Sequence, residues 1–262
     1  MIRWFRQLDE VLRGDATRAG RLGGGGRETP GDGERISLRG LTAVAVLLSA
    51  VYGLSVGAFA AIRTGGAELY QMFASAAKMP MLFFLTLLVT LPSLYVFSAL
   101  VGAGMKVGAV CRLLVAMLGV VTAVLASFAP IVVFFGVSTT SYPFMKLLNV
   151  AMCAVAGLLG LAFLVRTLRA MVGDGATPAA EIVETDGREG EAVPKTERSE
   201  ADRRASVVFR VWVVLFAFVG VQMSWVLRPF IGDPALPFAW FRNRESNFFT
   251  DVWSALIALL GG

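Results

Sequence analysis

The sequence predicts an all-α, polytopic membrane protein with about five transmembrane helices and an amphipathic interfacial helix at each end. Hydrophobic residues make up 56% of the 262 positions, charged residues 16%, and the mean hydropathy is +0.69. A soluble domain has about 45–50% apolar and about 25% charged residues. Five apolar stretches also approach the ~20 residues that cross a bilayer core of ~30 Å. Lipid is therefore predicted to surround most of the chain.

Two regions precede the first predicted span. Residues 1–14 place apolar side chains on one side of a helix and basic ones elsewhere. We expect an amphipathic cytoplasmic helix there, and we favour a position on an anionic leaflet over docking on a partner. Residues 15–40 are rich in glycine and charge and are predicted to form a flexible polar linker. Because this polar region comes first, the first apolar segment is expected to be retained and not cleaved as a signal peptide.

Residues 41–169 are predicted to form a four-helix transmembrane region. The expected spans cover about 41–62, 81–101, 113–135 and 144–165, and the first is about 33 Å long at 1.5 Å per residue. Small side chains recur every fourth position in this first span, at Ala45, Ser49, Gly53, Gly57 and Ala61. Because packing holds helices together in lipid, this stripe is a candidate helix-packing face.

Proline and polar residues add detail to the later spans. Residues 64–79 are interpreted as a connector with a short interfacial helix, and Pro80 is expected to open the second span. Pro92 should kink that span, and we favour a static bend over a transport hinge. Asn149 is a candidate polar intramembrane residue, for which we favour a helix–helix hydrogen bond over a polar cavity. For Lys146 we favour snorkelling to the interface.

Three regions follow. Residues 170–205 are predicted to be a disordered charged cytoplasmic linker, and 206–230 a fifth transmembrane helix that contains Gln222, the second candidate polar intramembrane residue. Residues 231–262 combine a Pro/Arg/aromatic segment with an amphipathic helix too short to span. An aromatic belt is favoured over a protein-binding site, and both remain open. The candidate partner or lipid contacts are Trp225, Arg228, Trp240, Arg242, Arg244 and Asn247.

Basic residues predict the orientation. With five spans and a cytoplasmic N-terminus, only six of the 24 Lys and Arg residues fall outside. The positive-inside rule thus predicts a bacterial inner-membrane protein with a cytoplasmic N-terminus and a periplasmic C-terminus. The six outside residues are Arg63, Lys78, Lys146, Arg228, Arg242 and Arg244.

The residue types argue against catalysis. The sequence has no histidine, and its two cysteines, Cys111 and Cys153, lack metal-site spacing. Residues 53–57, GLSVG, fit the GxSxG hydrolase motif, but that motif needs a strand–turn–helix context and a histidine. No carboxylate lies within a predicted span, which disfavours proton-coupled transport. No catalytic, cofactor or metal site is predicted, and anionic lipid explains the net charge of +5 without nucleic acid.

The amphipathic start, polar tail, five spans, prolines in the second and third spans and RTLR ending of the fourth resemble bacterial members of the Yip1 family. The resemblance covers about residues 41–169. It implies a small helical membrane protein that organises membrane or partner proteins. No functional residue is carried over, because no DLYGP-type signature is present.

The sequence therefore predicts a noncatalytic integral membrane scaffold or accessory subunit. Its expected partners are the lipid bilayer and a membrane protein or a second copy of the chain, joined through small-residue helix faces. The alternative is a small-solute transporter or channel that uses the kinked second span, Asn149 and Gln222.

Overall fold

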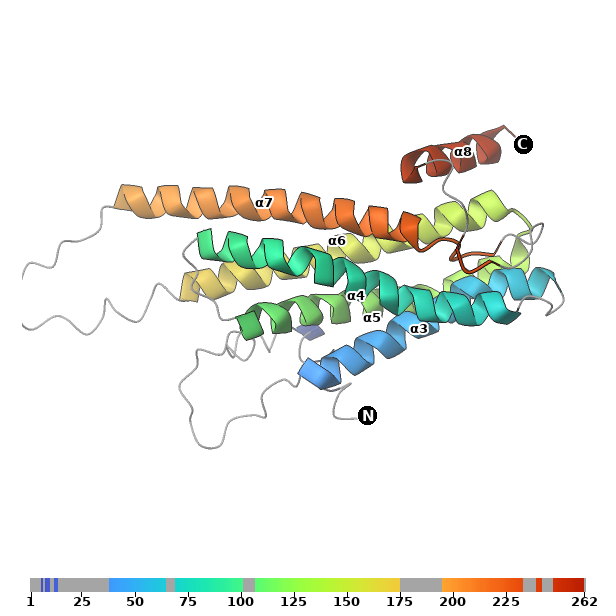
Figure 1. Ribbon diagram of the computed structural model, residues 1–262, viewed down its shortest axis with the longest axis horizontal. Helices are drawn as coiled ribbons and strands as arrows, with labels where there is room; N and C mark the ends of the chain where they lie inside the picture. The colour runs from blue at the N-terminus through green and yellow to red at the C-terminus, as the bar shows by residue number, and fades with distance from the viewer. Residues whose placement is uncertain are drawn as a thin grey trace, which may run out of the picture.

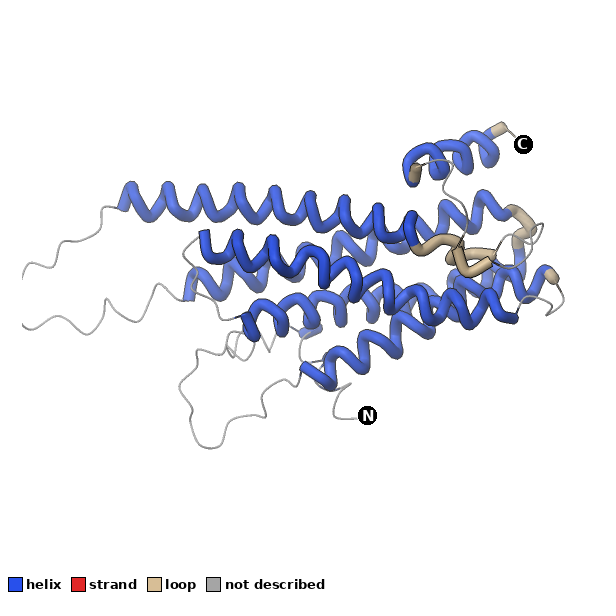
Figure 2. Tube along the Cα trace, viewed as in Figure 1, coloured by secondary structure: helices blue, strands red, loops and turns tan. Residues whose placement is uncertain are grey.

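The computed structural model describes residues 38–64, 69–100, 107–174, 195–232, 239–241 and 247–261, together with residues 6, 8, 9, 12 and 13. The described chain contains helices and short connections and no strand (Figure 2). The helices are α3 (Leu38–Arg63), α4 (Leu69–Leu100), α5 (Val107–Ser138), α6 (Tyr142–Asp174), α7 (Lys195–Val226) and α8 (Phe248–Leu260).

Four helices are long and apolar enough to cross a membrane by length and composition. The candidate spans within the described residues are Leu38–Arg63, Leu69–Ser93, Val110–Ser138 and Tyr142–Thr167. The apolar part of α7, Val211–Val226, is shorter than these four. The chain thus has the helices of a multi-pass membrane protein, while the fifth span stays a prediction.

The helices α3 to α7 run side by side and alternate in direction (Figure 1). Helix α3 packs on both α4 and α5, while α6 packs on α5 and α7 on α4. The end of α3, the turn between α5 and α6 and the end of α7 therefore meet at one end of the bundle, where α8 also lies (Figure 1). We call this the α8 end.

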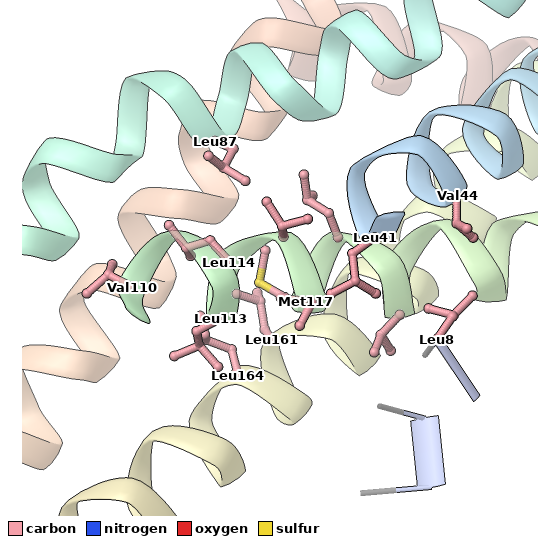
Figure 3. Close-up of a cluster of buried hydrophobic side chains, with 14 of the residues drawn as sticks. Leu8, Leu41, Val44, Leu87, Val110, Leu113, Leu114, Met117, Leu161 and Leu164 are labelled. Carbon is pink, nitrogen blue, oxygen red and sulfur yellow. The ribbon is translucent and has the colours of Figure 1, made fainter. Parts of the chain in front are cut away.

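Two apolar clusters form the core. One lies toward the α8 end and includes Tyr52, Phe59 and Leu125. The other lies toward the opposite end and is built mainly from α5 (Figure 3). Leu8, only 5% exposed, joins this second cluster, and its Cδ1 lies 2.9 Å from where a Cβ on Gly119 would be. One residue of the predicted N-terminal helix therefore packs on the bundle itself.

Helix α4 begins before Pro80, where the sequence predicted the start of the second span. The helix begins at Leu69 and continues through both Pro80 and Pro92, so the prediction that Pro80 opens the span was wrong. No glycine or proline interrupts residues 69–79. The helix therefore has no breaker before Pro80, and a bilayer penalises any backbone group left unpaired.

Helix also enters the predicted linkers. Helix α3 begins at Leu38, α6 continues to Asp174 and α7 begins at Lys195. Residues 195–205 consist largely of charged residues and alanine, many of which are good helix formers. The central part of the 170–205 linker, residues 175–194, and most of residues 1–37 lie outside the described residues.

Candidate functional site

A polar stripe runs along one side of α4 at the α8 end. Gln71, Ser75 and Lys78 are spaced four and three residues apart, so their side chains share a helix face. All three are buried, with at most 1% of their surface exposed. Such groups need hydrogen-bond partners, because an unpaired buried polar group is costly.

The partners are backbone carbonyls that follow α7. We call residues 227–232 and 239–241 the post-α7 segment. Gln71 Nε2 donates to the carbonyls of Pro229 and Phe230, at 3.3 Å each, and the Ser75 hydroxyl also donates to Phe230. Lys78 Nζ donates to Pro229 O at 3.1 Å and to the carbonyl of Trp240. The stripe on α4 therefore supplies donors to backbone carbonyls that lie beyond the end of α7, outside any helix.

The charge of Lys78 lies among dipoles and aromatic rings. Its Nζ is 5.7 Å from the ring centroid of Trp240 and 5.4 Å from that of Phe241. The carboxylates with described side chains, Asp9 and Asp251, pair instead with Arg13 and Lys146. Among the described groups, carbonyl oxygens and ring faces therefore stabilise the ammonium.

Close packing allows the post-α7 segment to reach this position. A Cβ at Gly232 would lie 2.6 Å from Ala60 Cβ and 2.7 Å from Gln71 Cγ, so only glycine fits. Phe230 and Ile231 are buried and belong to the core cluster near this end. The segment is therefore part of the folded bundle.

Other basic residues at the α8 end also bind groups of the chain. The Arg63 guanidinium donates to Val137 O at 3.0 Å and to the carbonyl of Thr139, where α5 ends. Arg228 lies over the ring of Trp225, with 3.5 Å between its Cζ and the centroid. Lys146 on α6 forms a 3.0 Å ion pair with Asp251 on α8. These cations hold the connections and α8 in place.

The small-residue stripe of α3 is occupied within the chain. Its members, Ala45, Ser49, Gly53, Gly57 and Ala61, are all buried. A Cβ on Gly53 would lie 2.4 Å from Ser75 O, and one on Gly57 would lie 2.6 Å from Met72 Cα. The two glycines thus allow the backbones of α3 and α4 to approach closely.

The structure places the candidate contact residues in different environments. Trp225 is buried beneath Arg228, whereas Trp240 is 53% exposed. Asn247 caps α8, because its side chain accepts a hydrogen bond from Thr250 N. Arg242 and Arg244 lie outside the described residues.

The two candidate intramembrane residues lie on different helices. Asn149 on α6 accepts a 2.9 Å hydrogen bond from the Tyr52 hydroxyl on α3. Gln222 lies half-buried on α7. The contact of Asn149 is therefore a helix–helix hydrogen bond.

Sequence reasoning missed the Gln71, Ser75 and Lys78 stripe. Residues 64–79 were interpreted as a connector, so helical spacing was not applied to their polar positions. The signal was the polar i, i+4, i+7 pattern within an apolar run.

The geometry of this site suits holding a peptide segment and displaying aromatic rings. Among the described residues, no group of three His, Cys, Asp or Glu side chains is placed to hold a metal ion. No protein-family profile, curated protein or solved structure matches the chain.

Proposed function

We propose that the protein is a noncatalytic membrane scaffold or accessory subunit whose contact surface is formed by Trp240 and Phe241. One observation carries this proposal: buried Lys78 holds the backbone of Trp240, while Trp240 and Phe241 stay 53% and 58% exposed. Aromatic residues are typical of binding hot spots. Side chains whose backbone is already held in place lose less conformational entropy when a partner binds. We therefore expect these two rings to contact a protein.

The proposal includes a fifth crossing by α7. The apolar part of this helix, Val211–Val226, covers about 24 Å at 1.5 Å per residue, and α7 packs along α4 (Figure 1). A fifth crossing gives the bacterial inner-membrane topology with the N-terminus in the cytoplasm and the α8 end in the periplasm. The distribution of Lys and Arg supports this orientation.

The packing of α3 changes where a partner is expected to bind. Because α4 occupies the small-residue stripe, we place the partner contact at the α8 end. The resemblance to the Yip1 family proposed from the sequence pattern would imply the same role, that of organising partner proteins. A transporter or channel has less support, because the Asn149 amide already bonds Tyr52.

Site-specific photo-crosslinking in native membranes tests this function. A benzophenone amino acid at Trp240 or Phe241 should give one discrete protein adduct. The matched control is the same probe at Leu158, an exposed apolar residue of α6. Adducts that are absent, or identical at all three positions, would contradict the proposed contact surface.

A second pair of variants links the adduct to Lys78. Lys78→Met should reduce cross-linking from Trp240 several-fold, because the carbonyl of that residue loses its donor. Arg112→Gln should leave the yield unchanged, since the bond that Arg112 makes among the described residues is to Gly108 O of its own helix, at 3.4 Å. Equal cross-linking yields in both variants would show that Lys78 does not position the Trp240 and Phe241 contact surface.

A further inference from the structure

Helix α8 presents an apolar face to its surroundings. It has 13 residues, about 20 Å in length, which is too short for a bilayer core of ~30 Å. Its large hydrophobic side chains are between 40% and 79% exposed at Phe249, Trp253, Ile257, Leu259 and Leu260. A helix this apolar needs an environment other than water on that face.

The hydroxyl and carboxyl groups of α8 are paired within the protein. Ser254 Oγ donates to Thr250 O at 2.8 Å, and Thr250 Oγ1 donates to Asn247 Oδ1 at 2.6 Å. Asp251, the one charged residue of the helix, pairs with Lys146 on α6. Internal pairing of this kind is what hydrocarbon demands of polar groups.

This pattern differs from that of an interfacial helix. A helix that lies in the headgroup plane keeps a strongly charged face toward water. The single charge of α8 is instead held by α6, and no other charged residue occurs between Phe248 and Leu260. The outward face of α8 therefore carries no charged group that could contact lipid headgroups, and only its aromatic rings suit the headgroup plane.

The position of α8 supports the same environment. The helix packs against α6 and lies beside the bundle, not beyond its end (Figure 1). The helix starts deeper along the bundle and runs toward the bundle end, where the C-terminus is marked (Figure 1). The neighbouring part of α6 belongs to the candidate span Tyr142–Thr167.

We propose that α8 is a half-membrane helix immersed among the acyl chains of the leaflet at the α8 end. The Lys146–Asp251 ion pair anchors it there, because each charge compensates the other where water is scarce. This placement replaces the interfacial position expected from the sequence. It does not depend on the partner proposed for Trp240 and Phe241.

Spin-label accessibility in proteoliposomes of phosphatidylethanolamine and phosphatidylglycerol tests this placement. A nitroxide is attached at Ile257→Cys after Cys111 and Cys153 are replaced by alanine. Two reference labels use the same background: Leu158→Cys on the exposed apolar side of α6, and Thr140→Cys in the exposed turn before it. Collision rates are measured with oxygen, which partitions into lipid, and with a water-soluble nickel chelate.

The Ile257 label should resemble the Leu158 label, with oxygen collisions well above nickel collisions. A label at Trp253→Cys, four residues earlier on the same face, should agree and guards against a misfolded Ile257 variant. Nickel accessibility like that at Thr140 would place α8 in water. Protection from both reagents would show that protein covers it. Either result would overturn the proposal.

Discussion

The hydroxyl of Tyr52 on α3 lies 2.9 Å from the amide oxygen of Asn149 on α6, a residue 97 positions later in the sequence. Tyr52 is fully buried. The bond therefore ties α3 directly to α6, which packs on α5.

Removing this bond should weaken the bundle modestly. Tyr52→Phe keeps the ring and deletes the donor, so we expect the free energy of unfolding to fall by ~0.6–1.7 kcal/mol. Denaturation by SDS in mixed micelles measures the change. Ser55→Ala is the control, because within the described part of the chain the exposed Ser55 hydroxyl bonds its own helix, at Val51 O. A loss no larger than that of the control would argue against the bond.

Gly53→Ala should destabilise the fold and not assembly. The new Cβ would lie 2.4 Å from the backbone oxygen of Ser75, which cannot move unless α3 and α4 separate. Overpacking of this kind costs ~1–3 kcal/mol, seen as a lower midpoint of thermal unfolding. Gly157→Ala is the matched control, because no described atom beyond its own helix backbone would lie within 4 Å of the new Cβ. Lost oligomers at unchanged stability would instead place the stripe in an intermolecular contact.

Lys78→Met should loosen the post-α7 segment. The carbonyls of Pro229 and Trp240 lose a donor in a buried environment, at a cost of ~1–3 kcal/mol. A cysteine at the buried Ile231 should then react with a maleimide about tenfold faster, as expected for ~1.4 kcal/mol. Arg112→Gln serves as control. An unchanged rate would mean that other contacts suffice to hold the segment.

The sequence predicted the helical class because lipid imposes a local rule. Every backbone group must be paired within the segment, so long apolar runs such as 41–62 become helices. The candidate spans at 38–63 and 142–167 overlap the expected ones closely. Pro80 was misjudged because a rule for helix starts was applied to a residue inside a longer helix.

The contacts of the site depend on residues distant in sequence. Lys78 and Pro229 are 151 positions apart, and no local pattern relates them. For Lys146 the sequence predicts snorkelling to the interface. The folded chain instead brings the Asp251 carboxylate to Lys146, and it brings backbone carbonyls to Arg63 and Lys78. The spacing of small residues in α3 predicted that some helix packs closely on it, but the spacing alone could not identify that helix as α4.

The Lys146–Asp251 pair distinguishes lipid from water around α8. Lys146→Met or Asp251→Leu alone leaves one charge without its partner, whereas the double variant removes both. In hydrocarbon we expect a coupling free energy of unfolding of ~1–3 kcal/mol, with the double variant close to the wild type. An exposed pair in water would give ~0.2–1 kcal/mol and would weaken as salt screens it. The cycle is measured by SDS unfolding at low and high salt. A coupling free energy that exceeds ~1 kcal/mol and does not change with salt would show that the Lys146–Asp251 pair is shielded from water. Because Asp251 lies on α8 and Lys146 on α6, α8 must then hold its carboxylate against α6 in a water-poor environment.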